Sequence, residues 1–300
     1  MDHRAFVASL APELRAELTT PSDRAGLLHL AGHVGAILLV GALIAMGWWA
    51  LIPVQGVLIV FLFTLEHEAT HKTPFASMAL NEWVGRVCGF LLLLPFDWFR
   101  SFHLAHHRWT NIDGKDPELE GGKPETLRAW LGHVSGVPYW VAGARLIVGL
   151  ARGHVRAAYL PETALPRMTR EARWMLAGYG LVLASFLVTP VLLWVWVVPV
   201  LLGQPALRLY LLAEHGDCPR VTDMFRNSRT TFTTWVMRFL AWNMPYHTEH
   251  HVYPQVPFYQ LPILHNMMRD HLKATSDGYG KFTIEYLKRR IIRSGPTSGS

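Results

Sequence analysis

Two long stretches of the chain contain no charged side chain. Residues 27–65 and 174–207, 39 and 34 residues long, have no Asp, Glu, Lys or Arg. A helix needs about 20 apolar residues to cross the hydrocarbon core of a bilayer, so each stretch has room for two crossings. Gly47-Trp48-Trp49 and Pro190 offer turns near their centres. The sequence predicts two helical hairpins, with helices over 27–47, 51–66, 174–189 and 192–212.

The charged residues lie in three other segments. Residues 1–26, 67–173 and 213–300 hold every Lys and Arg except Arg208, which stands at a helix end. Basic residues collect on the cytoplasmic side of membrane proteins. We therefore expect both termini and all three segments in the cytosol. The predicted fold is an all-α integral membrane protein with four transmembrane helices and a cytosolic helical cap.

We expect a single domain made of six consecutive segments of the chain. Within its cytosolic parts, a short surface helix is expected at Pro12–Leu18. Apolar pieces at Val84–Pro95 and Pro138–Leu150 are too short to span and predict re-entrant or interfacial helices. The expected divisions are a cytosolic lead-in (1–26), hairpin 1 (27–66), a cytosolic segment (67–173), hairpin 2 (174–212), a second cytosolic segment (213–293) and a disordered tail (294–300).

Composition excludes several other classes of protein. Half of the residues are hydrophobic (51%) and only 17% are charged, against about a quarter in soluble proteins. The net charge is +6, but the sequence has no basic run interleaved with aromatic residues, so a nucleic-acid partner is not expected. Two cysteines, Cys88 and Cys218, are too few for a disulfide scaffold or a thiolate metal site. The polar first 26 residues do not have the pattern of a cleavable signal.

Three histidine clusters lie in the predicted cytosolic segments. Their spacings of three and four residues put the imidazoles of each cluster on one side of a helix. A single histidine pair is usually structural, and His29 and His33 in the first hairpin are expected to be so. Three clusters on one membrane face instead indicate a shared metal site. They are His67/His71, His103/His106/His107 and His247/His250/His251.

The number of imidazoles limits what this site can hold. A structural zinc takes four ligands, and a catalytic zinc takes three and a water. Eight histidines therefore predict two metals, each with four or five protein ligands and open positions. Imidazole suits iron, copper, nickel and zinc, so the ligand type alone does not name the metal.

The order HxxxH, HxxHH, HxxHH around two membrane hairpins resembles the membrane fatty acid desaturase and hydroxylase superfamily. The resemblance runs from about Leu65 to His265. It includes the stretches that begin at Trp98 (WFRSFHLAHH), Asp116 (DPEL) and Val256 (VPFYQLP). It implies two iron ions that activate O2 and remove hydrogen from an unactivated C–H bond. It also implies a separate electron-donor protein, of the ferredoxin, rubredoxin or cytochrome type, because no fused donor is visible.

The resemblance adds two residues to the site. His215 corresponds to a ligand found shortly after the last span, and Asn243 to a residue that reaches the metal through water. His247 stands where front-end desaturases carry Gln, which makes that subgroup less fitting. Among nearby acidic residues, Glu214, Glu249 and Asp116 are candidates to orient the histidines. Glu66 and Glu68 are expected to be ordinary surface carboxylates, and Trp98 and Arg100 interfacial anchors.

Two interpretations outside this superfamily compete. His67-Glu68-Ala69-Thr70-His71 is literally H-E-x-x-H, which would make Glu68 the base of an intramembrane zinc protease. That interpretation leaves the six histidines of the second and third clusters unexplained. A receptor or structural zinc protein is the non-enzymatic alternative, although open coordination positions serve no structural purpose.

Within the superfamily, the choice lies between desaturation and hydroxylation. Both begin with hydrogen abstraction, and the outcome depends on fine placement of the substrate. The VPFYQLP stretch favours an acyl desaturase. We therefore expect an O2-dependent oxidoreductase acting on an acyl lipid or acyl thioester, whose chain length and head group the sequence leaves open.

Overall fold

The structure is a computed structural model, and it describes residues 1–292. The expected tail, 294–300, lies outside the described residues. The only strands in the described part are two parallel pieces, β1 Thr230–Thr231 and β2 Thr275–Ser276. The helices are α1 His3–Ser9, α2 Pro12–Leu18, α3 Asp23–Ala45, α4 Ile52–Val60, α5 Leu62–His71, α6 Met78–Leu92, α7 Phe96–Trp109, α8 Leu127–Ser135, α9 Val137–Ala151, α10 Leu165–Ser185, α11 Val198–His215, α12 Met224–Asn227, α13 Trp235–Leu240, α14 His247–Val252, α15 Leu261–Met268 and α16 Tyr279–Tyr286.

Short helical turns complete the chain. Those at Leu193–Val197 and Leu287–Ile292 are π-helical. The 3-10 turns are Trp49–Leu51, Pro117–Leu119, Glu162–Ala164 and Arg269–His271.

The first predicted hairpin is present and longer than expected. Helix α3 begins where the Ser22 hydroxyl accepts a hydrogen bond from the Ala25 N–H at 3.3 Å, an ordinary N-cap. The chain turns at Gly47, whose φ of 101° suits glycine. It returns through α4 and α5 to His71. The extension beyond the predicted end at residue 66 carries the first histidine pair out of the apolar stretch.

The second hairpin differs from the prediction in its first arm. Helix α10 is Leu165–Ser185, and its first three turns carry Arg167, Arg170, Glu171 and Arg173. Only three helical segments of the described chain are long and apolar enough to cross a membrane. Two bent pairs, α6 with α7 at 98° and α8 with α9 at 57°, would raise the number to five. The predicted count of four spans is therefore not confirmed. The three segments are Pro12–Ala45, Trp49–His71 and Leu193–His215.

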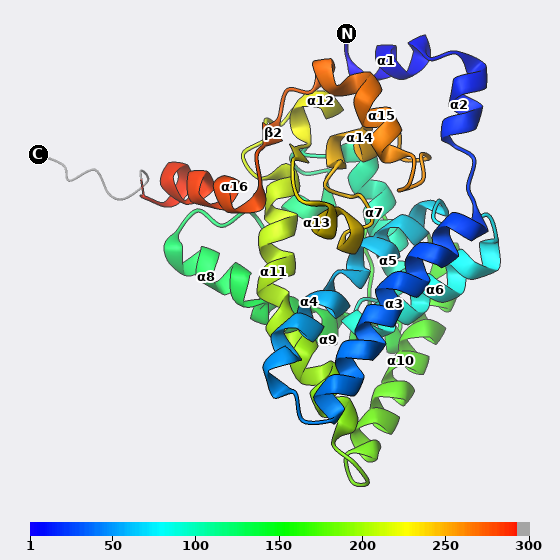
Figure 1. The fold of residues 1–300 in the computed structure, drawn as a ribbon, viewed down its shortest axis with the longest axis vertical. Coiled ribbons are helices and arrows are strands. Elements are labelled where there is room, and N and C mark those ends of the chain that lie inside the picture. The colour runs from blue at the N-terminus through cyan, green and yellow to red at the C-terminus, as the bar shows by residue number, and fades with distance from the viewer. Residues whose placement is uncertain (293–300) are drawn as a thin grey trace, which may run out of the picture.

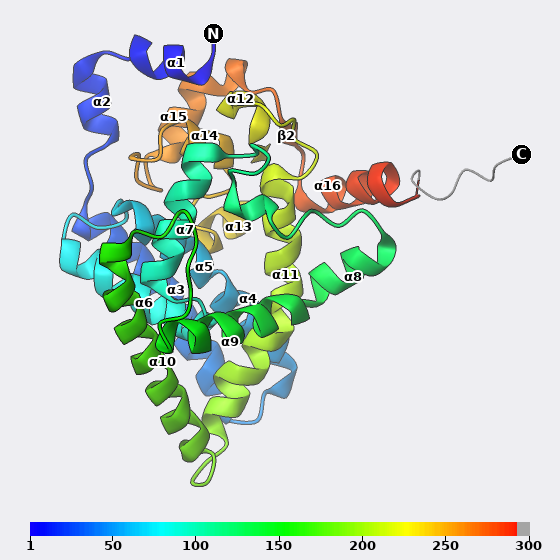
Figure 2. The same cartoon turned by 180° about the vertical axis from the view of Figure 1, so that it is seen from behind.

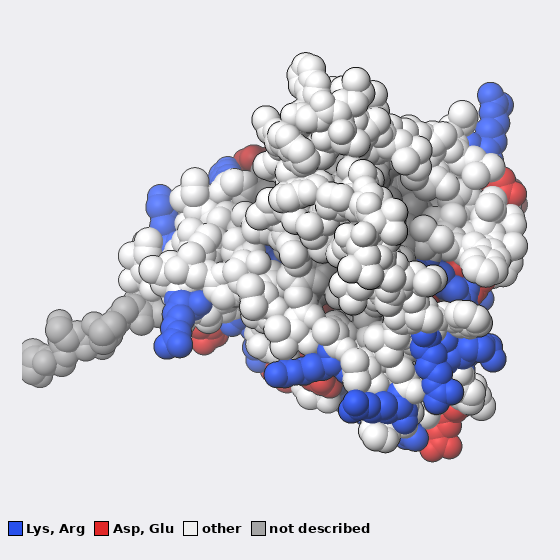
Figure 3. All heavy atoms as spheres, turned by 90° about the horizontal axis from the view of Figure 1, so that it is seen from below, with Lys and Arg blue, Asp and Glu red and all other residues white. Residues whose placement is uncertain are grey.

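The helices form a tapered bundle beneath a broader upper part. In Figures 1 and 2, α3, α4, α10 and α11 converge toward the lower end, while α1, α12, α14 and α15 lie at the top. Figure 3 views the molecule from below, where the centre and upper part show no Lys, Arg, Asp or Glu and the charges lie along the left, right and lower margins. An uncharged tip with charges set to its sides is the surface expected of a protein inserted in a membrane.

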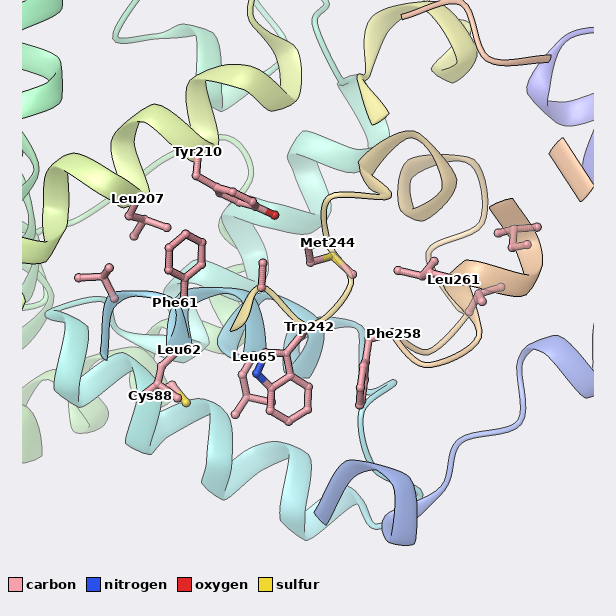
Figure 4. Close-up of a cluster of buried hydrophobic side chains, with 14 of the residues drawn as sticks. Phe61, Leu62, Leu65, Cys88, Leu207, Tyr210, Trp242, Met244, Phe258 and Leu261 are labelled. Atoms are coloured by element: carbon pink, nitrogen blue, oxygen red, sulfur yellow. The ribbon is translucent and has the colours of Figure 1, made fainter. Parts of the chain in front are cut away.

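One core connects the bundle to the upper part. Trp242 lies in it, and its indole Nε1 donates to His33 Nδ1 at 3.1 Å. The other ring nitrogen, His33 Nε2, lies 2.8 Å from the Leu58 carbonyl oxygen. His33 is thus a structural histidine, as predicted. Figure 4 shows this core, in which the labelled residues are Phe61, Leu62, Leu65, Cys88, Leu207, Tyr210, Trp242, Met244, Phe258 and Leu261.

Two predicted short helices have clear counterparts. Pro138–Leu150 lies within α9, and Pro12–Leu18 is α2. The apolar piece Val84–Pro95 covers the second half of α6 and the turn after it, where Leu93 adopts a left-handed φ of 57°. The chain then bends sharply into α7, the helix that bears the second histidine cluster.

Candidate metal centre

Each histidine cluster lies on its own helix. The first is on α5, the second on α7 and the third on α14. Helix α7 is fixed at its start by Glu171 of α10, whose two oxygens accept the backbone N–H groups of Phe96 and Asp97 at 3.1 and 2.9 Å. A carboxylate at a helix N-terminus pairs with the positive end of the helix dipole. Helix α14 follows a tight turn in which Trp242 and Asn243 have positive φ.

Five histidines form a first group. Their ligand atoms all lie within 4.8 Å of one another. The Nε2 atoms of His71 and His103 are 2.8 Å apart, and those of His107 and His250 are 3.1 Å apart. We call this set group one. Its members are His67, His71, His103, His107 and His250.

A second group gathers beside the first. His106, His215 and His251 have ligand atoms within 4.8 Å of one another. His215 is central, because its Nε2 lies 3.1 Å from His106 Nε2 and 2.9 Å from His247 Nε2. With His247, group two has four members. All nine histidines that the sequence and the resemblance singled out are thus brought together.

The two HxxHH clusters each contribute to both groups. On α7, His103 and His107 face group one and His106 faces group two; on α14, His247 and His251 face group two and His250 faces group one. Residues four apart lie nearly above one another on a helix, whereas adjacent residues point about 100° apart. An adjacent His-His pair can therefore serve two centres.

The nitrogen spacing fits metal ions. Two ligands at right angles, each ~2.0–2.1 Å from one metal, have nitrogens about 3 Å apart. The four Nε2 pairs are 2.8–3.1 Å apart. Buried nitrogens without a hydrogen-bond partner point the same way, since such atoms are costly to bury unpaired. Both ring nitrogens of His67 and Nε2 of His251 are of this kind.

The opposite ring nitrogens face oxygen atoms. This arrangement fixes the tautomer of an imidazole and turns Nε2 toward the centre. Three of the contacts are hydrogen bonds of Nδ1: 2.9 Å from His106 to Asp116, 3.0 Å from His215 to the Asn227 carbonyl and 3.2 Å from His251 to Thr110. His247 and His250 have no such bond at Nδ1, and the nearest carboxylates lie 3.3 Å (Glu214) and 3.6 Å (Glu68) away.

The chain matches the family model described as "Fatty acid desaturase" over residues 46–283. The chain belongs to this family. A mouse (Mus musculus) sphingolipid delta(4)-desaturase/C4-monooxygenase is 25% identical over 210 residues, which are 68% of this chain and 60% of the mouse protein. An acyl-lipid 8-desaturase of Rebecca salina is 24% identical over 90% of this chain and 65% of its own length. An sn-1 oleoyl-lipid 12-desaturase of a Picosynechococcus strain is 30% identical over 39% of this chain and 35% of its own length. The chain thus spans less than two thirds of each of these relatives.

Not every candidate residue meets the histidines of this desaturase-family centre. Asp116 and Glu214 do, as described above. Glu249 instead accepts from Thr230 at 2.6 Å and pairs with His265 Nδ1 at 2.5 Å. The Asn243 amide nitrogen donates to the Phe258 carbonyl at 3.0 Å.

Three surface predictions are wrong. Glu66 and Glu68 are fully buried, because α5 packs against α6 and α7 and Glu68 also meets the backbone of Phe258. Glu68 accepts from the Thr73 hydroxyl and the Phe258 N–H, both at 3.0 Å. Arg100 is not an interfacial anchor either. It is 9% exposed and pairs with Glu82 at 2.7 Å.

Several contacts of the desaturase-family site were missed from the sequence. Glu68 directly follows His67 in the sequence, which is a usable signal for this contact, although the sequence alone predicts a surface carboxylate. Glu118 lies 3.4 Å from His106 Nδ1 and belongs to the DPEL stretch. The Asn227 contact is made by a backbone carbonyl, which leaves no signal in a sequence.

Burial keeps the α14 imidazoles uncharged. It lowers the pKa of His247, His250 and His251 well below the ordinary value of 6.5, and neighbouring histidines lower it further. Neutral imidazole is the form that binds a metal. The site is therefore ready to take up a cation at neutral pH.

A cavity of about 320 Å³ opens beside the histidines. It is lined by members of both groups, His67 and His103 of group one and His106 and His247 of group two. Its apolar wall is Phe63, Leu94, Trp98, Phe99, Phe102, Leu211 and Leu212. Trp98, expected as an interfacial anchor, thus lines the cavity. The size is within the range of small-molecule sites, and an apolar molecule in it would meet both histidine groups.

Proposed function

We propose that this protein is an O2-dependent, non-haem di-iron oxidoreductase that desaturates the acyl chain of a lipid or acyl thioester. The observation that supports this most is the pair of histidine groups at the wall of one largely apolar cavity. Family membership supports the same chemistry. The overall reaction takes two hydrogens from adjacent carbons, two electrons from a donor and two protons, and reduces O2 to two molecules of water.

The proposed iron ligands are the two groups themselves. His67, His71, His103, His107 and His250 would hold one iron, and His106, His215, His247 and His251 the other, with Asn243 acting through water. When bound, the irons supply the oxidising power needed to break an alkyl C–H bond, which no side chain has. An all-imidazole set also fits zinc or copper, so the identity of the metal rests on the family.

The protein's own residues prepare this chemistry. Asp116 holds the His106 ring through a contact with Nδ1 at 2.9 Å, which limits rotation of the ring. Glu214 and Glu68 lie 3.3 and 3.6 Å from Nδ1 of His247 and His250. The aromatic wall of the cavity, with Phe99 and Phe102, would bind an alkyl chain and exclude water from it. Holding one segment of that chain against the histidines supplies the orientation on which the rate depends.

Hydroxylation is the second candidate, and one relative favours it. The mouse protein is named both as a desaturase and as a C4-monooxygenase. The two outcomes share the first hydrogen abstraction. They differ in whether a second hydrogen leaves or an oxygen atom is added to the carbon.

The protease alternative has little support here. Glu68 would have to activate a metal-bound water, yet its carboxylate accepts from Thr73 and Phe258 and lies near His250 Nδ1. These contacts suit a group that positions a histidine.

We also propose that the site and both termini lie on the cytoplasmic side. The support is the distribution of Lys and Arg along the sequence. In this arrangement a soluble electron donor of the ferredoxin, rubredoxin or cytochrome type would have direct access to the metal centre.

The first test is metal content, followed by product analysis. Protein purified from iron-57-grown cells is expected to carry about two irons per chain by elemental analysis, with Mössbauer spectra of imidazole-ligated iron, as two groups of four or five ligands require. Incubation with acyl lipids, O2 and a reducing system is expected to give products lacking two hydrogens. Products that gain one oxygen would select hydroxylation. One zinc per chain and no iron would contradict the proposal.

A further inference from the structure

The cavity beside the histidines also has polar residues in its lining. Lys123, His133, Tyr139 and Arg208 line it together with the apolar wall. Arg208 belongs to α11, within a segment apolar enough to cross a membrane. A cation in such a segment faces the protein interior or a polar cavity and usually serves function.

Lys123 and Arg208, the two cationic side chains of this lining, have no carboxylate partner in the described residues. Within the described residues no carboxylate oxygen lies within ion-pair distance of Lys123 or Arg208. Arg208 Nε donates to the Gln204 side-chain oxygen at 3.1 Å, and its guanidinium lies 4.5 Å from the centre of the Tyr139 ring. These contacts hold the side chain in place but provide no opposite charge for it.

The two carboxylates of the cavity already have other contacts. Glu118 lies 3.4 Å from His106 Nδ1, and Glu214 lies 3.3 Å from His247 Nδ1. Lys123 and Arg208 line the same cavity without an ion-pair partner among the described residues.

The local packing keeps Arg208 in position. Gly136, with φ of 72°, joins α8 to α9 directly against Gln204; a Cβ on Gly136 would lie 2.5 Å from Gln204 Cβ. His133 Nε2 lies 3.3 Å from the Arg208 carbonyl oxygen. Helices α8 and α9 thus hold the segment of α11 that presents the guanidinium.

We propose that Arg208 and Lys123 bind an anionic oxygen, a carboxylate or a phosphate, on the polar head of the substrate. This inference rests on the proposed function and specifies its substrate class. Arg208 precedes His215 by seven residues of one helix, about 10 Å at 1.5 Å per residue. An amphiphile held by its head at Arg208 would therefore place a defined part of its chain at the histidines. A neutral lipid would lack this anchor.

The test compares three amphiphiles of equal chain length, and it does not require turnover. Binding of hexadecyl phosphate, hexadecanoic acid and hexadecanol to the purified, metal-loaded protein is measured by native mass spectrometry in a neutral detergent. Both anions are expected to bind at least tenfold more tightly than the alcohol. The better anion identifies the source of the oxygen. Arg208→Gln and Lys123→Gln are each expected to reduce this preference at least tenfold, and Arg208→Lys to reduce it less.

The control variant is Arg156→Gln, because Arg156 is exposed and donates only to backbone carbonyls. It is expected to keep the full preference. Equal binding of the alcohol and the anions would overturn the proposal. An unchanged preference for the anions in Lys123→Gln would also overturn the proposal. This second variant keeps the test decisive if Arg208→Gln does not fold. A protein without iron that still prefers the anions would contradict the proposed reaction but not this site.

Discussion

The Nε2 atoms of His106 and His215 lie 3.1 Å apart, although the two residues are separated by 109 positions in the chain. His106 comes from α7 and His215 from the last residue of α11. Two neutral imidazoles at this distance share at most one proton, whereas a metal accepts both lone pairs. The contact therefore marks the place where the long apolar helix α11 meets the histidine clusters.

Removal of His215 is expected to empty one of the two sites. His215 is the only member of group two outside the three histidine clusters, and it touches both His106 and His247. In His215→Ala, bound metal is expected to fall from about two ions per chain to about one, since four ligands become three. Elemental analysis of purified protein measures this ratio. His154→Ala, at an exposed histidine, is the matched control, and an equal loss there would contradict the assignment.

Asp116 is expected to strengthen metal binding without being a ligand. Its carboxylate lies 2.9 Å from His106 Nδ1 and also accepts the Asn111 N–H at 2.7 Å. Loss of such a partner typically lowers metal affinity about 10–100-fold. Asp116→Asn keeps the shape and removes the charge, so competition with a chelator is expected to show a decrease of that order.

A surface carboxylate provides the comparison for Asp116. Asp113 is exposed and pairs with exposed Arg220 at 2.6 Å, a kind of pair that contributes about 0–1 kcal/mol. Asp113→Asn is expected to leave chelator competition unchanged. If both variants lost metal equally, the role assigned to Asp116 would be wrong.

The box histidines could be predicted from the sequence because their spacing reflects helix geometry. What spacing does not give is the partition between the groups. His106 and His107 are adjacent, yet they face different groups, and this depends on how α7 is rotated against α5 and α11. That rotation is set by packing between segments far apart in the chain.

The supporting carboxylates were harder to predict for a related reason. Glu68 resembles a surface residue in the sequence, but it is buried because α5 packs against α6 and α7. Glu249, in contrast, lies within a histidine cluster and turns away to His265. Proximity along the chain fixes which helix a residue is on but not which side of it meets the site. The first arm of the second hairpin begins earlier than predicted. Helix α10 starts at Leu165 and includes four charged residues in its first three turns, whereas the prediction began after the last charge.

The metal-free protein is expected to lose stability as the pH falls below 6.5. Burial holds the pKa of His247, His250 and His251 well below 6.5 in the folded state. The unfolded chain takes up protons near that value, so acid favours unfolding between 6.5 and the lower folded pKa values. Thermal unfolding of chelator-treated protein between pH 8 and pH 5 measures the effect. His250→Gln is expected to show a shallower decline, and an identical decline would count against this cause.

The crossing of α4 and α11 is expected to tolerate no side chain. A Cβ on Gly203 would lie 2.4 Å from the Gly56 carbonyl oxygen, and one on Gly56 would lie 2.3 Å from the Pro199 carbonyl oxygen. Small residues let helix backbones approach closely in membranes. Because the obstacle is backbone, Gly203→Ala must separate the helices, which costs about 1–3 kcal/mol or more. It is expected to lower the melting temperature and, through α11, to displace His215 and reduce bound metal.

Gly180 offers the matched control for this crossing. It is an exposed position of α10, and no group outside the helix's own neighbouring backbone lies within 4 Å of the position that an alanine methyl would take there. Gly180→Ala therefore removes only the conformational freedom of glycine, a change that stabilises a helix by about 0.5–1 kcal/mol. The two alanine variants are expected to shift the melting temperature in opposite directions. A Gly203→Ala protein as stable as the parent, with metal retained, would mean that α11 does not position the site through this contact.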